Sequence, residues 1–315
     1  MSDFSNSPCY GCGTQRCPGE EDCITYKKHY GIPLTEEETN LETFYAILNK
    51  ELLGEYRPES LNKNDIKLVN ADCLEYMKTL ESNSIDLIMT SPPYNCGIDY
   101  NIYDDERPYQ EYLDWCQEWI NECYRVCKDD GRIAINVLVE MGIENNTVRV
   151  SPMAEFIRMI NLAGFHLMGL PMWLDNHRVK YTAWGSWMSA SAPYIYNPNE
   201  TVILGYKKYH KKQYDGESTI INKREFINGC SGIWDIRPET RGLTKANFPV
   251  ELPERVINLL TYKGDTVLDP FSGSGTTGIA CLNLERKYIG IEIDALYHKV
   301  AQNRINDYSI QSMLF

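Results

Sequence analysis

The stretch TVLDPFSGSGTTGIACLNLERKYIGIEID, residues 266–294, decides the fold. A short apolar run leads into a glycine-rich turn, helix-forming residues follow, and a second apolar run ends in acids. Gly273 and Gly275 permit a tight turn and close approach of a ligand to the backbone. Glu292 follows the turn by about twenty residues, where an acid can hold ribose hydroxyls. The pattern lacks a third glycine and a phosphate-binding lysine, so it predicts a site for an uncharged nucleoside end.

Short apolar runs alternate with longer helical patterns from Lys67 onward. The predicted strands cover 68–71, 85–89, 133–139, 165–174, 201–205, 266–269 and 288–293. Between them, Ser151 and Pro152 mark a helix start and Gly164 its end. Alternation of this kind predicts an α/β fold with a mostly parallel sheet of seven strands and helices on both faces.

Composition narrows the class of protein. The chain has 315 residues, 43% hydrophobic and 24% charged, as in an ordinary globular protein. It contains no run of 18 apolar residues and its first residues lack a signal-peptide pattern, so we expect no membrane partner and a cytoplasmic location. The net charge of −13 means that any DNA contact must come from local basic stretches. The candidates are 207–212, Arg178 with Lys180, and Arg237, Arg241 and Lys245.

A second stretch, TSPPYN at 90–95, follows the predicted strand at 85–89. Prolines cannot donate to a sheet ladder and they fix their own φ, so the strand ends here in a stiff turn. A stiff turn that carries Ser91 and Tyr94 indicates a surface held in a defined shape. The alternative is a proline-stiffened turn at the edge of a sheet with no chemical role.

The two turns together resemble those of the DNA amino-methyltransferases. DPFSGSGTT (269–277) resembles their S-adenosylmethionine turn, and TSPPY (90–94) resembles their catalytic loop. Three shorter stretches, ADCL, WGSW and FPVELP, match at 71–74, 184–187 and 248–253. The catalytic loop precedes the cofactor turn, which is the circularly permuted beta arrangement of the family. The resemblance covers residues 62–305 and implies a Rossmann-like S-adenosylmethionine-dependent methyltransferase fold.

The resemblance gives the stiff turn a chemical role. Exocyclic amines of cytosine and adenine are poor nucleophiles because their lone pair is delocalised into the ring. By family analogy the Pro92 carbonyl and the Ser91 side chain accept the two amine hydrogens. Pro93 would fix the direction of that carbonyl, and Tyr94 would stack on a base swung out of the duplex.

The residue at position 91 bears on the target base. A carboxylate or Asn there marks the adenine-N6 enzymes of the family, whereas Ser is more usual in the cytosine-N4 enzymes. We expect cytosine-N4 methylation of double-stranded DNA, in a restriction–modification system with a cognate restriction endonuclease. Adenine-N6 methylation is the alternative. RNA bases or protein glutamine amides as acceptors, and a non-catalytic DNA-binding module, are less favoured by the motif order and the intact turns.

The family also implies a set of cofactor contacts. Asp269 would meet the methionine amino group, and Glu292 would hold the ribose. Asp72 would approach the adenine, although a helix N-cap before Cys73 explains it nearly as well. The expected cofactor-binding residues are Asp72, Phe248, Asp269, Phe271, Gly273, Gly275, Thr276 and Glu292.

Two regions are expected along the chain. Residues 1–60 form a Cys-rich N-terminal extension with one helix at 41–56, and residues 61–315 form the catalytic domain. A target-recognition insertion is expected at 205–233, where lysines with Tyr209, His210 and Tyr214 could meet phosphates and bases.

Four of the eleven cysteines cluster in the extension, at Cys9, Cys12, Cys17 and Cys23. The pattern C-x2-C-x4-C-x5-C indicates a structural zinc site of four thiolates, with an iron–sulfur cluster and free thiols as alternatives. Three others, Cys116, Cys123 and Cys127, share a helical spacing with Leu113 and Ile120. They are expected to be core residues of a helix.

Overall fold

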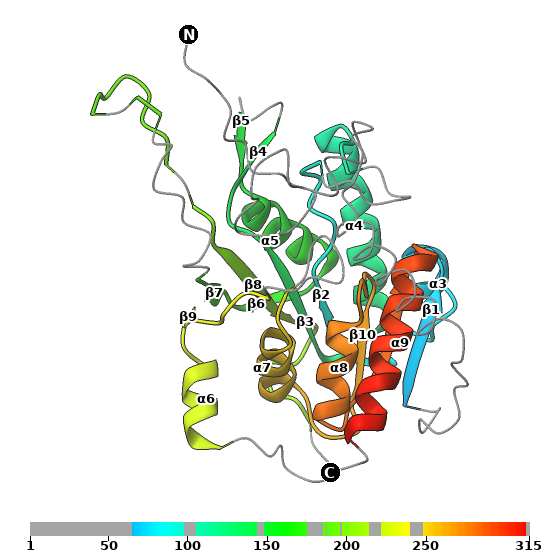
Figure 1. The fold of residues 1–315 in the computed structure, drawn as a ribbon. Helices are drawn as coiled ribbons and strands as arrows, with labels where there is room; N and C mark the ends of the chain where they lie inside the picture. Colours follow the sequence, from blue (N-terminus) through cyan, green and yellow to red (C-terminus); the bar gives the residue numbers. More distant parts are fainter. Residues whose placement is uncertain are drawn as a thin grey trace, which may run out of the picture. The chain divides into compact units, whose positions relative to one another are not determined.

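The computed structural model describes residues 65–97, 105–143, 148–174, 185–186, 188–195, 197–213, 222–239 and 248–312 (Figure 1). They belong to one unit, Leu61–Glu239 with Ala246–Phe315. The predicted extension at 1–60, with its helix and its cysteines, lies outside the described residues. The same holds for Arg178, Lys180, Trp184, Trp187, Tyr214, Arg241 and Lys245. The predicted division into an extension and a catalytic domain stays a prediction.

A sheet of nine strands forms the centre of the described part (Figure 1). Five parallel neighbours make up one side, in the order β1 (Ile66–Asn70), β11 (Lys287–Glu292), β10 (Thr266–Asp269), β2 (Ile85–Thr90) and β3 (Cys127–Leu138). On the other side β8 (Glu200–Tyr206) runs antiparallel to β3. Its outer neighbours are β6 (His166–Gly169) and β7 (Met172–Trp173), and β9 (Ile233–Trp234) pairs with β7. A separate ribbon joins β4 (Met141–Ile143) to β5 (Val148–Val150).

All seven predicted strands are present, with one difference. The run predicted at 165–174 is two short strands, β6 and β7, separated by Leu170 and Pro171. Proline has no N–H for the ladder. The Pro171 carbonyl instead accepts from the Val202 amide at 3.0 Å and from the Thr201 hydroxyl at 3.0 Å. The break separates β6 from β7, and β9 pairs with β7 beyond the predicted strands.

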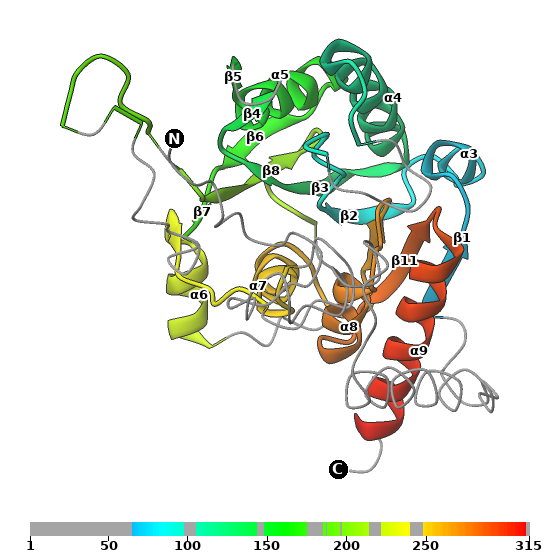
Figure 2. The same ribbon diagram turned by 45° about the horizontal axis from the view of Figure 1, so that its top comes forward.

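Helices cover both faces of the sheet (Figure 2). One face carries α3 (Cys73–Met77), α4 (Tyr109–Val126) and α5 (Pro152–Ala163); the other carries α7 (Glu251–Leu260), α8 (Thr276–Asn283) and α9 (Ala295–Ser312). A short helix, α6 (Lys223–Gly229), lies near α7. Successive side chains of β2 point to opposite faces of the sheet. Ile88 packs in the cluster under α4, whereas Leu87 and Met89 pack in the cluster under α7 and α8. The helix-covered α/β sheet is therefore confirmed.

The predicted start and end of the helix at 152–163 are confirmed. Ser151 caps α5, because its side chain accepts from the Ala154 amide, and Gly164 ends that helix in the left-handed region at φ 108°. Cys116 and Cys123 are fully buried in α4. Cys127 is buried too, but it begins β3, because α4 ends one residue earlier.

The direction in which the strand order runs reverses between β10 and β2, at the centre of the sheet, and this place is a topological switch point. From β10 the chain passes through α8 to β11 on one side, and from β2 it passes through α4 to β3 on the other. Connections that diverge in this way leave a crevice at the carboxyl ends of the two strands, where ligands of open α/β sheets bind. Since β10 follows β2 in the chain, the order of the two halves is permuted as predicted.

Candidate functional site at the carboxyl edge of the sheet

The carboxyl ends of the parallel strands gather the predicted site residues at one edge. Asp72 follows β1, Ser91 follows β2, Asp269 ends β10 and Glu292 ends β11. These strands are hydrogen-bonded neighbours, so their ends meet at the same edge. Residues that are up to 220 positions apart in the chain (72 to 292) thereby share one region.

Asp269 lies between the two predicted turns and is only 1% exposed. Its Oδ1 accepts from the Thr90 hydroxyl at 2.7 Å, and its Oδ2 accepts from the Thr277 hydroxyl at 2.7 Å. The Phe271 amide adds a third donor at 3.1 Å. Burial raises the pKa of Asp269 to about 6, although these hydrogen bonds oppose the rise. Asp269 therefore loses its proton less readily than an exposed carboxyl group, and a nearby cation would stabilise its charged form.

The glycine turn has one open side and one packed side. Gly273 and Gly275 have φ of 51° and 79°, a region that favours glycine. A Cβ on Gly275 would meet Ile305 and Ala301 of α9 at 3.0 and 3.1 Å, whereas a Cβ on Gly273 would meet nothing within 4 Å. Gly275 therefore serves packing, and the space beside Gly273 is available to a ligand.

Glu292 holds the glycine turn from the next strand. Its Oε2 accepts from the Gly273 amide at 2.8 Å, and its Oε1 accepts from the Asp294 amide at 2.9 Å. Burial raises the pKa of Glu292 above its ordinary value. The carboxylate and the open side of Gly273 are thus adjacent, which places an acceptor beside the space for a ligand.

The stiff turn is held from both sides. Pro92 is buried, and Tyr112 of α4 donates from its hydroxyl to the Pro93 carbonyl at 2.8 Å. The Ser91 and Tyr94 hydroxyl oxygens lie 2.8 Å apart. The turn is therefore a fixed surface whose Ser91 hydroxyl is part of a hydrogen-bond cluster.

Two residues of that cluster were not predicted from the sequence. Glu200 at the start of β8 accepts on Oε2 from the Tyr94 hydroxyl at 2.9 Å and from Asn136 Nδ2 at 2.5 Å. Asn136 lies on β3 and is 1% exposed. The available signal was a polar residue inside the apolar run 133–139 and an acid at the start of the run 201–205. Polar residues in such runs need buried partners.

The remaining predicted residues have defined surroundings. Asp72 caps α3, because its Oδ1 accepts from the Glu75 amide at 3.1 Å, so the alternative explanation for Asp72 is observed. The Phe271 ring packs against Trp115 and Trp119 of α4, with ring centroids 5.6 and 5.2 Å away. Their contacts with a cofactor stay predictions.

Thr276 and Phe248 complete the predicted cofactor set. Thr276 Oγ1 accepts from Arg304 of α9 at 2.8 Å, and Arg304 also donates to the Ser274 carbonyl. Arg304 thus braces the back of the glycine turn, a role that no sequence pattern indicated. Phe248 is half-buried against the cluster that includes α7. A cofactor contact by either predicted residue stays a prediction.

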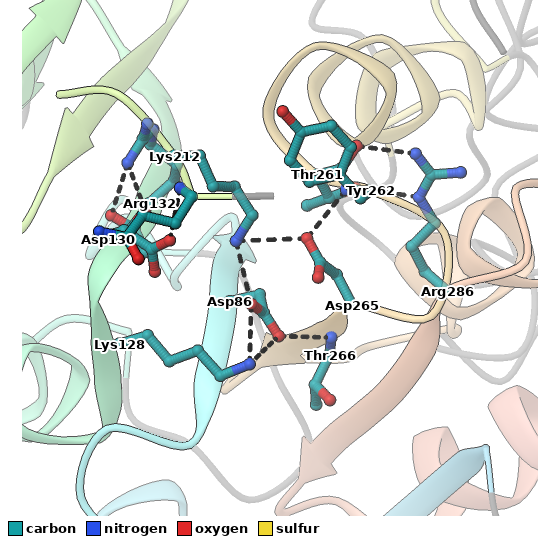
Figure 3. A network of polar contacts seen from close by, with 12 residues as sticks. Asp86, Lys128, Asp130, Arg132, Lys212, Thr261, Tyr262, Asp265, Thr266 and Arg286 are labelled. Atoms are coloured by element: carbon teal, nitrogen blue, oxygen red, sulfur yellow. Dashed lines mark hydrogen bonds and ion pairs between the residues drawn. The ribbon is translucent and has the colours of Figure 1, made fainter. Parts of the chain in front are cut away.

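The basic segment 207–212 is used for internal ion pairs. Lys212 lies between Asp86 Oδ1 at 2.9 Å and Asp265 Oδ2 at 3.2 Å, with its side chain 9% exposed (Figure 3). Lys207 and Lys208 pair with Asp129 at 3.8 and 2.9 Å. Burial alone would raise the pKa of Asp86, but hydrogen bonds from Lys128, Lys212 and the Thr266 amide lower it below its ordinary value.

These ion pairs lie at the amino end of the sheet. Asp86 is at the start of β2, and Asp265 directly precedes β10. The proline-rich turn that begins at Thr90 leaves the opposite end of β2. Three lysines of the segment therefore have a structural role away from the site, and DNA contact by them stays a prediction that this position disfavours.

Metal and membrane features are limited to what the described ranges contain. Within them, no three His, Cys, Asp or Glu side chains group as a metal site. The predicted zinc ligands Cys9, Cys12, Cys17 and Cys23 lie outside these ranges, and nothing supports the zinc. No helix of the described part is both long and apolar enough to cross a bilayer.

The fold is an α/β sheet with a switch point, and the residues at that point suit a nucleoside-type ligand. A family model for DNA methylases matches residues 85–303. The chain is 41% identical over 179 residues to the Type II methyltransferase M.MjaVI of Methanocaldococcus jannaschii, covering 56% of this chain and 89% of the relative. It is 30% identical over 258 residues to M.HpaI of Haemophilus parainfluenzae, covering 77% and 74%.

Solved structures agree. The Thermus thermophilus protein TTHA0409, complexed with S-adenosyl-L-methionine, superposes with a TM-score of 0.63 at 25% identity, covering 77% of this chain and 93% of that one. The chain belongs to the DNA methylase family of N6/N4 amino-methyltransferases.

Proposed function

We propose that the chain transfers a methyl group from S-adenosylmethionine to the N4 amino group of cytosine in double-stranded DNA. Membership of the DNA methylase family gives the reaction class. The observation that carries the site is the hydrogen bond between Thr90 and Asp269, because it ties the turn with Ser91 to the glycine turn. The two turns can then serve one reaction centre.

The residues at the glycine turn fit the cofactor. When bound, S-adenosylmethionine supplies an electrophilic methyl group. The space beside Gly273 admits a ligand, and the buried Asp269 carboxylate is an acceptor for an ammonium group. Glu292, next to that space, is suited to ribose hydroxyls. TTHA0409, which superposes on this chain, is complexed with the same cofactor.

The residues of the catalytic turn orient the target amine. The Ser91 hydroxyl and the Pro92 carbonyl accept the two amine hydrogens, which localises the nitrogen lone pair. Pro93 and the hydrogen bond from Tyr112 hold the turn, so the acceptors keep their direction. Tyr94 supports the extrahelical base with its ring. Water is kept from the acceptors by the same stacked base.

The target base follows from Ser91. Serine is the usual residue at this position in the cytosine-N4 enzymes that the turn resembles, and this favours cytosine. Adenine-N6 methylation is the second candidate, because the same turn and the same two acceptors would orient an adenine amine. The proposal for cytosine rests on this one residue.

The names of two relatives support a role in a restriction–modification system. M.MjaVI and M.HpaI are named Type II methyltransferases, and we infer that this chain modifies DNA alongside a cognate restriction endonuclease. A cytoplasmic location is part of the same proposal. The target-recognition insertion at 205–233 stays a prediction, and its lysines 207, 208 and 212 do not support it, because they form ion pairs at the opposite edge of the sheet.

Transfer of labelled methyl groups tests the proposal. The protein is incubated with labelled S-adenosylmethionine and, in parallel, with unmethylated duplex DNA, RNA or a protein mixture. We expect label in duplex DNA alone. Label in RNA or protein would assign a different acceptor, and cofactor binding without transfer to any acceptor would contradict the proposed reaction.

A further inference from the structure

A buried carboxylate lies behind the catalytic turn, and the proposed function gives it no role. Glu200 is 6% exposed, and Asn136 beside it is 1% exposed. A carboxylate in such a place is costly unless donors surround it. Here Tyr94 Oη at 2.9 Å and Asn136 Nδ2 at 2.5 Å converge on the same oxygen, Oε2. One of the two donors belongs to the catalytic turn itself.

The Tyr94 hydroxyl has a single proton, and its surroundings decide where that proton goes. Glu200 Oε2 lies at 2.9 Å and the Asn136 backbone carbonyl at 3.2 Å. A carboxylate is the stronger acceptor, and here it is also the closer one. Tyr94 therefore donates to Glu200. Its oxygen is left as an acceptor, for Asn136 Nδ2 at 3.1 Å and for Ser91 Oγ at 2.8 Å.

The role of Tyr94 as an acceptor also decides which way the Ser91 hydroxyl points. With Tyr94 as an acceptor, the Ser91 proton goes to Tyr94 Oη at 2.8 Å or to the Asn136 backbone carbonyl at 3.3 Å. Both acceptors belong to the cluster. A hydroxyl has one proton and two lone pairs, so Ser91 keeps only acceptor capacity for anything outside the cluster. An amino group, which presents hydrogens, requires such an acceptor.

We propose that Glu200 is a positioning residue that sets the direction of the hydrogen-bond chain from Ser91 through Tyr94. It thereby makes Ser91 an acceptor for the amine of the target base. Asn136 assists, because its amide group donates to both Tyr94 and Glu200 and so has one orientation. The inference rests on the proposed function of the catalytic turn, since it concerns the amine that Ser91 receives.

The test compares two substitutions and their combination. Glu200→Met removes the acceptor at similar volume, and Tyr94→Phe keeps the ring but breaks the chain. Each is expected to lower kcat about tenfold, the effect of one oriented hydrogen bond. Cofactor affinity and the KM for DNA are expected to change little, whereas the melting temperature of Glu200→Met is expected to fall, because Tyr94 and Asn136 lose a buried acceptor. The double variant is expected to lose no more than either single one, because Glu200 acts through Tyr94.

Two further variants test whether the effect depends on an acceptor at position 200. Glu200→Gln can present its amide oxygen to both donors, so it should restore most of the lost kcat. Glu140→Met is the matched control, because Glu140 lies just past β3 and pairs with Arg149 at 28% exposure, outside the chain of hydroxyls. It should leave kcat unchanged.

The outcomes separate this inference from the proposed function. If the parent protein labels no DNA base, the proposed function fails and the inference with it. If the parent is active but Glu200→Met and Tyr94→Phe keep full kcat, only the inference fails. Losses that multiply in the double variant would also overturn it. If Glu200→Met does not fold, the Tyr94→Phe and Glu200→Gln variants still decide, because a full-rate Tyr94→Phe contradicts the chain.

Discussion

Thr90 donates a hydrogen bond of 2.7 Å to Asp269, across the junction of β2 and β10. Thr90 ends β2 and begins the proline-rich turn at 90–95, and Asp269 ends β10 and begins the glycine-rich turn. The contact joins the two halves of the site by side chains that are both fully or almost fully buried. A change at either residue should therefore affect both halves.

Thr90→Val removes this donor while keeping the shape of the side chain. The buried carboxylate then loses one of its hydroxyl partners, which costs about 1–3 kcal/mol of folding free energy. We expect a lower free energy of unfolding in denaturant titrations and a weaker affinity for S-adenosylmethionine. Thr79→Val is the control, because the Thr79 hydroxyl bonds an exposed carbonyl at 2.8 Å. Equal behaviour of the two variants would contradict the role of Thr90.

The pH dependence of cofactor binding should report Asp269. Burial raises its pKa from 3.8 to about 6. The free protein thus holds a neutral Asp269 below pH 6 and an anionic one above it. If the anion meets the methionine ammonium, affinity should rise as pH increases through about 6 and level off above 7. Asp269→Asn should flatten this rise in equilibrium binding measurements, and an unchanged profile would assign it to another group, such as Glu292.

The same raised pKa has an opposite effect on stability without cofactor. A carboxyl group whose folded pKa is raised destabilises the fold as pH rises, because the unfolded chain loses the proton first. The penalty from Asp269 is absent below pH 3.8, grows between pH 3.8 and about 6, and reaches roughly 3 kcal/mol above that. Asp269→Asn should therefore be relatively more stable than the parent at pH 8 than at pH 5. Identical differences at both pH values would argue against the raised pKa.

Substitutions of the two glycines of the turn should have different effects, one on cofactor binding and the other on stability. Gly273→Leu places a side chain in the open space beside the turn, so cofactor binding should be lost while the fold survives. Gly275→Leu should instead destabilise the protein, because its side chain would press on Ala301 and Ile305. Both also carry the strain of a positive φ, about 1 kcal/mol. Calorimetry of binding and of unfolding separates the two, and retained affinity in Gly273→Leu would exclude the proposed ligand space.

Lys212 should matter for stability and not for DNA. Lys212→Met removes the cation shared by Asp86 and Asp265, although Asp86 keeps Lys128 at 2.8 Å, so the free energy of unfolding should fall by about 1–3 kcal/mol. The exposed Lys211 is the matched control, and Lys211→Met should unfold like the parent. A loss of DNA affinity at unchanged stability in Lys212→Met would restore the phosphate-binding interpretation of this lysine.

The sequence predicts the elements of the site better than its contacts. Gly273, Gly275 and Glu292 stand out locally, because a turn between strand and helix has few sequence solutions. The capping role of Asp72 could be predicted for the same reason. By contrast, Thr90 and Asp269 are 179 residues apart, and their contact exists only because β10 inserts beside β2. No local pattern encodes which strands are neighbours.

Charged residues were the hardest to predict. Lysines 207, 208 and 212 look like a solvated basic run, yet their partners Asp129, Asp86 and Asp265 come from distant segments. Glu200 and Asn136 were visible only as polar residues in apolar runs. Such residues indicate that a buried partner exists, but the fold decides which one.

The most direct measurement identifies the methylated nucleoside. Duplex DNA is incubated with the protein and labelled S-adenosylmethionine, digested, and its nucleosides are resolved by mass. The proposed function predicts N4-methylcytosine as the labelled product. N6-methyladenine would keep the site and its mechanism but contradict the assignment from Ser91, and DNA without label would contradict the proposed function itself.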